Sequence, residues 1–276
     1  MFHLIARPAN ETLRRFGALA LALSLIAGCA DLPDPDDAEA VAEYEEVNDP
    51  GEPTMRAIFS FNRVIDKVIL KPSAEVLRET PASFQRGVHN FLNNLHSPVI
   101  FFNDILQGEF ERAGTTLARF LVNSTIGILG FMDQAKEMGL EFHNEDFGQT
   151  LAVWNIPEGP YLMLPVFGPS NPRDTVGLVV DFLLDPFNWL ASNTDNDWAT
   201  WARAGVRGVD QRARHFDALE DLEKSSLDFY AAIRSLYRQH REDEISNGES
   251  SSFMEAPTMG MDIQIPSADD GEVSQK

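Results

Sequence analysis

Residues 143–146, His-Asn-Glu-Asp, place an imidazole beside two carboxylates. Such groups could hold a metal ion or transfer protons. Adjacent side chains rarely point into one site, however, and no second histidine follows at metal-ligand spacing, as it would in a His-Glu-x-x-His motif. We therefore interpret the run as a polar turn or helix cap ahead of Gly148, with a metal or acid–base site as the alternative.

Residues 168–172, Gly-Pro-Ser-Asn-Pro, resemble the turn that presents a nucleophilic serine in hydrolases. They follow an apolar run and precede a predicted helix, but the closing glycine is absent and two prolines would obstruct the strained turn. A helix start is the simpler interpretation, with Ser170 or Asn171 as the cap and Pro172 in the first turn. Asp174 would then lie near the positive end of the helix dipole.

Absent motifs and the acidic net charge exclude several classes of function. It contains no phosphate-binding loop, dinucleotide fingerprint or zinc-ligand spacing. The net charge of −21 argues against a nucleic-acid partner, which requires basic patches that displace counterions. It also argues against electrostatic capture by anionic lipids, so any membrane contact should be hydrophobic. We therefore predict a protein that is not an enzyme, has no cofactor or metal and does not bind nucleic acid.

The sequence Ile-Ala-Gly-Cys at residues 26–29 closes a short apolar run that follows three arginines. A basic start, a short apolar run and a small-residue exit are typical of a secretory signal peptide. The exit resembles the lipidation box of bacterial lipoproteins, in which the cysteine becomes the first mature residue and carries acyl chains. Cys29 is the only cysteine in the sequence, so no disulfide can form within the chain. We predict a signal peptide over residues 1–28 and a lipid anchor at Cys29.

Acidic segments flank the central region. Residues 31–52 hold ten acidic residues and no basic residue, and like charges with little apolar surface favour a disordered, extended chain. The chain from residue 242 onward is rich in serine and acidic residues and has no hydrophobic period. The predicted organisation is a signal peptide (1–28), a lipidated cysteine with an acidic tether (29–52), a helical domain (53–241) and an acidic disordered tail (242–276).

The central region is predicted to be helical. Apolar residues recur at three- and four-residue spacing over residues 58–69, which predicts a helix that begins near Pro53 and ends at Pro72. A second apolar stripe predicts one long closing helix over residues 210–242. Between them, glycines and prolines such as Pro98 should break the chain into short helices, which favours a curved or ring-like arrangement.

Segments between these helices are apolar with few charges, and none reaches the 18 apolar residues expected of a membrane-spanning helix. They cover residues 88–106, 116–132, 161–167 and 175–190. They could form a buried core, or they could lie in the membrane with tryptophans such as Trp189 at headgroup level. The lipid anchor favours the second interpretation. We predict an all-α protein, a single ring-like domain of short and amphipathic helices partly embedded in one membrane leaflet.

A series of motifs, taken in order, resembles the VacJ/MlaA family of lipoproteins. The two most specific are residues 119–127 (RFLVNSTIG) and 144–151 (NEDFGQTL). Shorter motifs are Asn-Asp-Pro at 48–50, Leu-Lys-Pro at 70–72, Leu-Gln-Gly at 106–108, Gly-Pro-Tyr at 159–161 and Gly-Pro-Ser at 168–170. The resemblance covers about residues 48–241. It departs from the family pattern at Gly51, where leucine is common.

The resemblance implies both a fold and a function. Members of the family are outer-membrane lipoproteins with an all-helical, ring-shaped body in the inner leaflet, and they keep the outer leaflet free of misplaced phospholipid. A polar pore lets a headgroup pass, a soluble periplasmic carrier receives the lipid, and porins are the usual partners. For this chain we expect a phospholipid channel, anchored through Cys29 at the periplasmic face of the outer membrane.

Uncharged amides among the apolar segments are candidates for the lipid path. The candidate residues are the asparagines Asn90, Asn93, Asn94, Asn103 and Asn123, together with the aromatic neighbour Phe91. Amides can hydrogen-bond a headgroup without holding it tightly, as a conduit requires. The alternative is that these asparagines cap short helices.

Two other functions stay open at this point. One is a structural lipoprotein that organises porins or division machinery. The other is a lipid hydrolase that uses Ser170 as its nucleophile.

Overall fold

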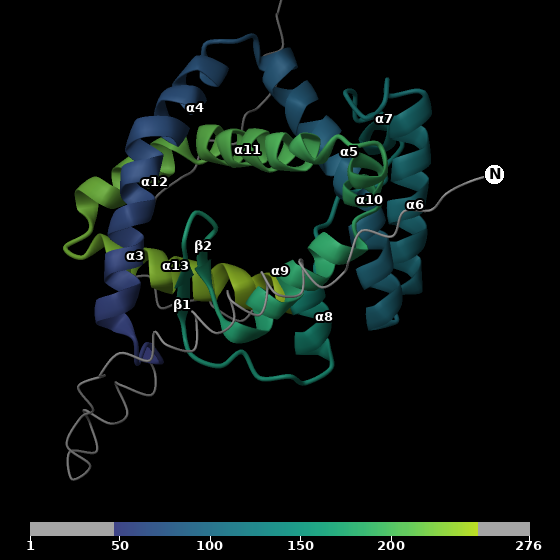
Figure 1. The fold of residues 1–276 in the computed structure, drawn as a ribbon. Coiled ribbons are helices and arrows are strands. Elements are labelled where there is room, and N and C mark those ends of the chain that lie inside the picture. The colour runs from purple at the N-terminus through teal and green to yellow at the C-terminus, as the bar shows by residue number, and fades with distance from the viewer. Residues whose placement is uncertain (1–46, 248–276) are drawn as a thin grey trace, which may run out of the picture.

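The computed structural model describes residues 47–247, which form a mostly helical domain (Figure 1). The predicted signal peptide, the lipid anchor at Cys29 and most of the tether and tail lie outside the described residues. The first half consists of α3 (Glu52–Ile65), the π-helix η1 (Asp66–Leu70), α4 (Lys71–Arg78), α5 (Ala82–Gln107), α6 (Phe110–Thr125), α7 (Gln134–Glu137) and α8 (Phe147–Val153). The second half consists of β1 (Leu162–Leu164), β2 (Gly168–Ser170), α9 (Pro172–Leu184), α10 (Pro186–Asn193), α11 (Asp197–Arg214), α12 (Phe216–Ser225) and α13 (Phe229–Ile245).

The elements close on themselves to form a ring. The helix α3 packs against β1, β1 pairs with β2, and both β2 and α8 contact α13. The helix α8 packs against α5, and α5 contacts α4, which continues α3 through η1. The helix α11 lies along one side of the opening against α4 and α5, and α9 and α13 lie on the other side (Figure 1). The predicted ring-like helical domain is confirmed.

Ion pairs join the first and last elements of the ring. The buried Asp49 carboxylate accepts hydrogen bonds from the Tyr230 hydroxyl at 2.5 Å and from Arg234 at 2.8 Å. Arg241 of α13 pairs with Asp146 at the start of α8, with a shortest N–O distance of 2.6 Å. Asp49 lies within the segment predicted as tether, and α13 continues to Ile245, so the folded domain extends slightly beyond both predicted boundaries.

The first helix begins as predicted but continues through Pro72. Pro53 lies in the first turn of α3, where its missing N–H is tolerated. The chain then forms the π-helical turn η1, in which the Lys71 N–H donates to the Asp66 carbonyl. The wider turn restarts the helix as α4 with Pro72 in its first turn, so the proline does not end the helical path. The prediction of a stop at Pro72 was wrong for this reason.

Pro98 also fails to break its helix. It lies inside α5, which runs without interruption from Ala82 to Gln107. The helix ends instead at Gly108, whose φ of 85° is in the left-handed region and whose N–H caps the last turn. The prediction of short pieces in this region was therefore wrong, and a single long helix forms one wall of the ring.

The predicted closing helix over residues 210–242 is three helices. The helix α11 ends at Arg214, α12 is a separate helix, and α13 begins after Asp228, whose carboxylate accepts from the Tyr230 and Ala231 N–H groups. The apolar stripe continues across these breaks, so periodicity alone could not reveal them. The acidic face of α12 pairs with the basic side chains of the first helices, as in Arg78–Asp217 at 2.8 Å.

A two-stranded hairpin is the exception to the all-α prediction. The strands β1 and β2 are antiparallel, with Leu162 opposite Ser170 and Leu164 opposite Gly168. Met163 and Tyr161 from this region join Met55 and Tyr230 in a small hydrophobic core. The hairpin therefore packs against α3 through β1 and against α13 through β2.

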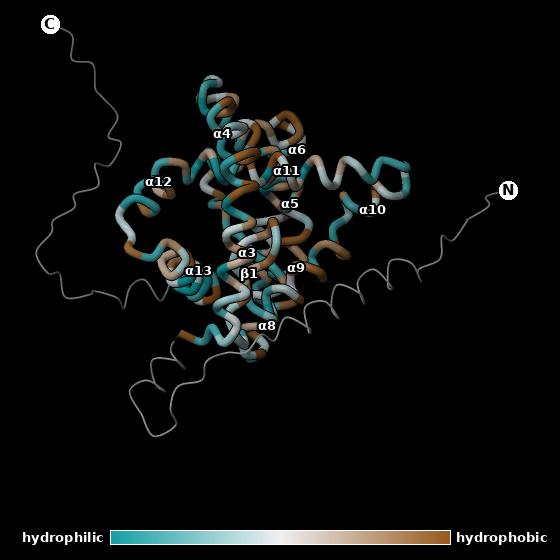
Figure 2. The backbone as a smooth tube through the Cα atoms, turned by 60° about the vertical axis from the view of Figure 1, so that its left-hand side comes forward, coloured by the Kyte–Doolittle hydropathy of each residue, from teal (hydrophilic) through white to brown (hydrophobic). Residues whose placement is uncertain are grey.

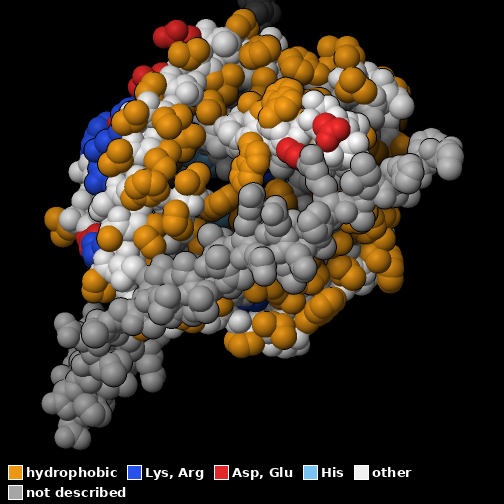
Figure 3. All heavy atoms as spheres, viewed as in Figure 1, with side chains coloured by type: hydrophobic (Ala, Val, Ile, Leu, Met, Phe, Trp, Pro, Cys, Tyr) orange, Lys and Arg blue, Asp and Glu red, His pale blue; other side chains and the backbone are white. Residues whose placement is uncertain are grey.

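Polar and apolar side chains are distributed unusually between the interior and the surface. Among residues 47–247, 20 buried residues are polar or charged and 12 are hydrophobic, whereas 36 large hydrophobic residues are exposed. Hydrophobic side chains cover much of the visible face (Figure 3). The backbone around α10 carries both apolar and hydrophilic residues (Figure 2). None of the helices within residues 47–247 has the length and apolar composition to cross a membrane.

Candidate functional site

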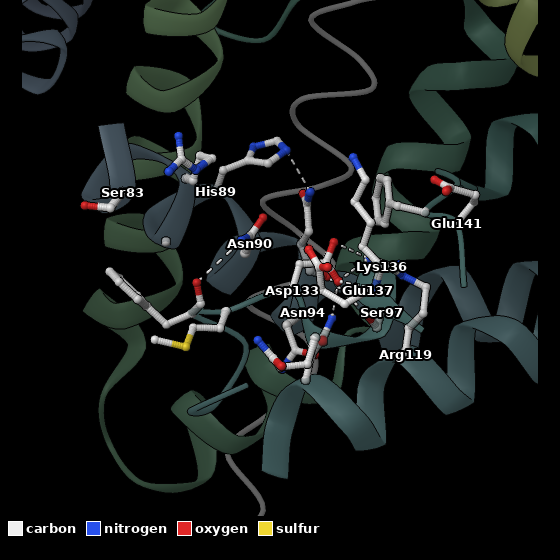
Figure 4. Close-up of a pocket in the computed structure, with 18 of the residues that line it drawn as sticks. Ser83, His89, Asn90, Asn94, Ser97, Arg119, Asp133, Lys136, Glu137 and Glu141 are labelled. Carbon is white, nitrogen blue, oxygen red and sulfur yellow. Dashed lines mark hydrogen bonds and ion pairs between the residues drawn. The ribbon is translucent and has the colours of Figure 1, made fainter. Parts of the chain in front are cut away.

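A polar cavity of about 650 Å³ lies between α5, α6, the turn after α6, α7 and the end of α11 (Figure 4). It brings together four of the six residues predicted for the lipid path: Asn90, Asn93, Asn94 and Asn123. Its other lining residues are Ser83, Arg86, Gly87, His89, Ser97, Arg119, Phe131, Met132, Asp133, Gln134, Lys136, Glu137, Glu141, Phe142 and Arg214.

The helix α5 places its asparagines in the cavity because they recur at helical spacing on one face. The Asn94 side chain is buried, and its amide nitrogen donates to the Ser124 hydroxyl at 2.9 Å. Its carbonyl oxygen is buried without a hydrogen-bond partner among the described residues. Gly130 packs directly on this side chain, since a Cβ there would lie 2.3 Å from Asn94 Cβ, and its φ of +93° also favours glycine.

An ion pair holds the opposite wall. Arg119 donates two hydrogen bonds to Asp133, at 2.8 and 2.9 Å, and Asn123 donates a third at 2.9 Å. The Asn123 carbonyl accepts from the Ala135 N–H at 2.9 Å, which fixes the start of α7. Burial alone would raise the pKa of the Asp133 carboxyl, but the hydrogen bonds from Arg119 and Asn123 outweigh it and lower that pKa.

His89 links the cavity to α11. Its Nε2 lies 2.9 Å from the Asn93 amide nitrogen, a donor, and its Nδ1 lies 2.8 Å from the Asp210 carboxylate, an acceptor. With these partners Nε2 accepts a hydrogen bond and Nδ1 carries the proton. The imidazole therefore acts as a fixed bridge between α5 and α11.

Charges of both signs surround the mouth of the cavity. Arg86 and Lys136 are exposed there and have no ion pair among the described residues, and Glu137 and Glu141 are exposed nearby. Arg214 is partly neutralised by Asp210 at 3.4 Å. The floor is lined by amides and the rim by mixed charges, an arrangement suited to a polar group that carries both a positive and a negative charge.

Asn103 and Phe91 do not line the cavity. Asn103 is 1% exposed; its amide donates to Asp181 at 2.9 Å and its carbonyl accepts from the Thr150 hydroxyl at 2.9 Å. These bonds connect α5 with α8 and α9. Phe91 is partly exposed on another face of α5. The structure therefore separates these two residues from the other predicted path residues.

The side chains of residues 143–146 point to different partners. His143 Nε2 lies 2.9 Å from Asp104, Glu145 pairs with Arg112, and Asp146 caps α8 by accepting from the Gln149 N–H at 3.0 Å. The interpretation as a polar turn and helix cap is confirmed. Within residues 47–247, no group of three histidine, cysteine or carboxylate side chains is arranged to hold a metal ion.

Ser170 is the last residue of β2 and directly precedes the N-cap of α9, so of the two predicted cap residues Asn171 is the cap. Asn171 is the N-cap of α9 and accepts from the Asp174 N–H at 2.7 Å. The Ser170 hydroxyl is buried and lies 3.0 Å from the Thr175 hydroxyl. A serine in this setting has no basic group that would activate it as a nucleophile within the described part of the chain.

Sequence reasoning missed several residues of the cavity and its surroundings. Arg119 and Asn123 are four residues apart within one family-like motif, so they could have been paired on one helix face. The arginines Arg203, Arg207 and Arg214 of α11 also recur near helical spacing. That pattern indicates a charged inner face opposite exposed tryptophans.

The fold and the cavity define a mostly helical ring with an apolar outer surface and a polar interior. The family model for MlaA lipoprotein matches residues 47–244, which is nearly the whole described domain. The chain therefore belongs to the MlaA lipoprotein family.

Several bacterial proteins are similar to this chain over most of their own length. The intermembrane phospholipid transport system lipoprotein MlaA of Haemophilus influenzae is 31% identical over 84% of this chain and 90% of its own. The protein of the same name in Escherichia coli K12 is 30% identical over 88% of this chain and 93% of its own. An uncharacterized protein of Rickettsia prowazekii is 33% identical over 74% and 81%.

A solved structure has the same fold. It was described as a structural basis for maintenance of bacterial outer membrane lipid asymmetry. It superposes with a TM-score of 0.63 at 31% sequence identity, and the match covers 71% of this chain and 98% of that chain.

Proposed function

We propose that this protein transports phospholipid as a lipoprotein of the outer membrane, removing misplaced phospholipid from the outer leaflet and passing it toward the periplasm. The observation that carries the proposal is the pairing of an apolar exterior with a polar cavity between α5, α6, α7 and the end of α11 in one helical ring. A lipid needs both environments, because its acyl chains and its headgroup have opposite solvent preferences. The names of the similar proteins support the same function.

The apolar exterior supports partial embedding in one leaflet. Trp189, Trp198 and Trp201 are each more than 60% exposed, and tryptophan is favoured at the membrane–water interface. Burying apolar surface is favourable by about 25 cal/mol per Å², so exposed aromatic residues on this scale favour a membrane environment. The absence of a spanning helix within residues 47–247 is compatible with a body that enters one leaflet only.

The cavity supports passage rather than tight storage. Its floor offers the amide of Asn90, which makes only one long bond, and its rim offers separated positive and negative charges. Uncharged hydrogen-bonding groups contribute about 1 kcal/mol each, which is enough to guide a headgroup without trapping it. Phe91 and Asn103, which lie outside the cavity, would act on the lipid path only indirectly.

The partners and the location follow from the same proposal. Acylation of Cys29 would hold the domain at the periplasmic face of the outer membrane. A soluble periplasmic carrier would receive the lipid, and an outer-membrane porin would be the second protein partner. Transport of this kind makes and breaks no covalent bond, so no enzymatic residue is required.

Deletion of the gene tests this proposal directly. Phospholipid should accumulate in the outer leaflet, and sensitivity to detergent should rise, because misplaced phospholipid weakens the outer barrier. Expression of the full chain should restore both. A deletion strain with unchanged surface phospholipid would contradict the proposal.

A further inference from the structure

A cluster of basic groups lies between α5 and α11, two helical turns along α5 from His89. His96 follows His89 by seven residues and so shares its face of α5. On α11, Arg207 and Arg203 precede Asp210 by about one and two turns. The 2.8 Å bond between His89 and Asp210 fixes the register of the two helices. Beyond that bond, Arg207 and Arg203 are the cationic neighbours of His96.

Arg207 has no protein partner among residues 47–247, although carboxylates lie near it. Its acidic neighbours are Asp185 and Asp210. Asp185 is already bonded to Arg203 and to the Phe187 N–H at 2.9 Å. Asp210 is bonded to His89 and to Arg214, and neither carboxylate bonds Arg207.

Two more groups in the cluster have unused hydrogen-bonding capacity. One guanidinium nitrogen of Arg203, Nη1, is buried without a hydrogen-bond partner. His96 forms no ion pair or hydrogen bond with the described residues. A buried guanidinium donor without a partner is costly, and an anion bound at this point would satisfy Arg203 Nη1.

The local field is also positive. Burial lowers the pKa of Arg207, and the neighbouring Arg203 lowers it further. Burial lowers the pKa of His96 well below its usual value, and the two arginines add to the effect, so its imidazole is neutral. The cluster thus offers fixed guanidinium donors beside an uncharged imidazole, and a bound anion would relieve the repulsion between the arginines.

We propose that Arg207, Arg203 and His96 form a binding site for the phosphodiester of a phospholipid headgroup at the α5–α11 junction of the ring. Arginine matches phosphate oxygens with paired, parallel hydrogen bonds. The opposite face of α11 exposes Trp198 and Trp201, so the same helix presents polar donors inward and apolar surface outward. This assignment rests on the proposed transport function and names the lipid group that the ring recognises.

Binding of three soluble probes to the full-length protein in detergent micelles tests the site. The probes are dihexanoyl phosphatidylethanolamine, inorganic phosphate and dihexanoylglycerol, and their dissociation constants are measured by calorimetric titration. The phospholipid should bind and the phosphate-free glyceride should not. Arg207→Gln should weaken phospholipid binding about tenfold or more, because a charge-assisted bidentate contact is lost. Arg207→Lys should retain part of the affinity, since it keeps the charge but loses the fork.

Lys224→Gln provides the matched control, because it removes one positive charge from an exposed position on α12. It should leave all three dissociation constants unchanged, and helix content measured by circular dichroism should be equal in all variants. Equal phospholipid affinity in Arg207→Gln and the natural chain would overturn the site. Tight binding of inorganic phosphate without binding of the phospholipid would also overturn it, by assigning the cluster to free phosphate.

The test of the headgroup site and the test of the transport function can fail independently. If the deletion strain exposes outer-leaflet phospholipid and Arg207→Gln complements it fully, transport stands and this site is rejected. If the deletion has no effect on surface phospholipid but Arg207→Gln still loses phospholipid affinity, the site stands without the transport function.

Discussion

At the scale of single residues, the cavity depends on amides that are only partly used by the fold. Asn123 makes two bonds that hold α6 to α7. The amide of Asn90, by contrast, has one long bond of 3.4 Å to the Phe131 carbonyl. The asparagines therefore divide into those that build the wall and those that are available to a passing headgroup.

Asn90→Leu separates transport from scaffolding. Because the natural residue makes only one long bond, the variant should fold and localise normally while outer-leaflet phospholipid rises toward the level of the deletion strain. Asn193→Leu, at an exposed position at the end of α10, makes the same change outside the cavity and should complement fully. Full complementation by Asn90→Leu would favour a scaffolding role.

Arg119→Met should destabilise the domain by about 3 kcal/mol. The substitution keeps most of the side-chain volume but leaves the Asp133 carboxylate without its ion-pair partner in a half-buried position. Thermal unfolding in detergent micelles measures the change. The double variant Arg119→Met with Asp133→Asn should recover part of the loss, and a single variant as stable as the natural chain would contradict the role given to this pair.

Stability should depend on pH through Asp181. Burial raises the pKa of its carboxyl to about 6, against hydrogen bonds from the Phe147 N–H and Asn103 that lower it. The folded state thus binds a proton more tightly than the unfolded state, whose carboxyl titrates near 4. This group's contribution is fully present below about pH 4 and is lost as pH rises through about 6.

The variant Asp181→Asn isolates that effect. For the natural chain, the Asp181 contribution should decrease by about 2–3 kcal/mol between pH 4 and pH 7, at about 1.4 kcal/mol per unit of pKa difference. The variant should lack this component. Parallel melting curves for the two proteins across that range would show that the group does not titrate as described.

At the scale of elements, α5 is the helix that organises the site. It presents Asn90 and Asn94 to the cavity and His96 to α11, and on the face opposite Asn94 it places Asn103 against α8 and α9. The glycines that shape the neighbouring turns have different roles. Gly130 contacts Asn94 directly, whereas a Cβ at Gly108 would meet no atom within 4 Å.

Gly130→Ala and Gly108→Ala form a matched pair. Both positions have φ in the left-handed region, which costs a side chain about 1–2 kcal/mol. Gly130→Ala should cost more, because the added methyl group must also displace Asn94 from the cavity wall. Unfolding midpoints measure both variants, and an equal loss at the two positions would show that the contact with Asn94 is not tight.

Sequence reasoning predicted the helical composition and several local features of these elements. A cap at Ser170 or Asn171 could be predicted because capping depends on side chains within one helical turn, and Asn171 is the N-cap of α9. The breaks after Arg214 and before Asp228 could not be predicted, since the apolar stripe runs through them and tertiary ion pairs fold the chain back. The continuation through Pro72 depends on a π-turn that no simple pattern signals.

The candidate site could be predicted only in part, for a geometric reason. Asn94 and Asn103 are nine residues apart, which is two and a half turns of helix, so they lie on opposite faces of α5. That spacing was sufficient to separate them once the helix was known to pass through Pro98. The arginine–histidine cluster required the register between α5 and α11, which depends on contacts distant in sequence.

At the scale of the whole molecule, the ring places hydrophobic side chains outward and polar side chains inward. Ordinary water-soluble domains expose scattered apolar residues but rarely large continuous patches. The closed packing keeps the polar interior in place, since the first and last elements are joined by Tyr230 and Arg234 at Asp49. Under the proposed function, this ring is seated in one membrane leaflet and handles phospholipid without altering it.

The lipid bound to the full-length protein, purified from its own membrane in mild detergent and measured by mass spectrometry, tests that account most directly. It predicts intact diacyl phospholipid at a defined ratio to protein. Free fatty acid or lysolipid generated by the purified protein would contradict it by showing hydrolysis. Absence of specific lipid would contradict it by leaving a scaffold that handles no phospholipid.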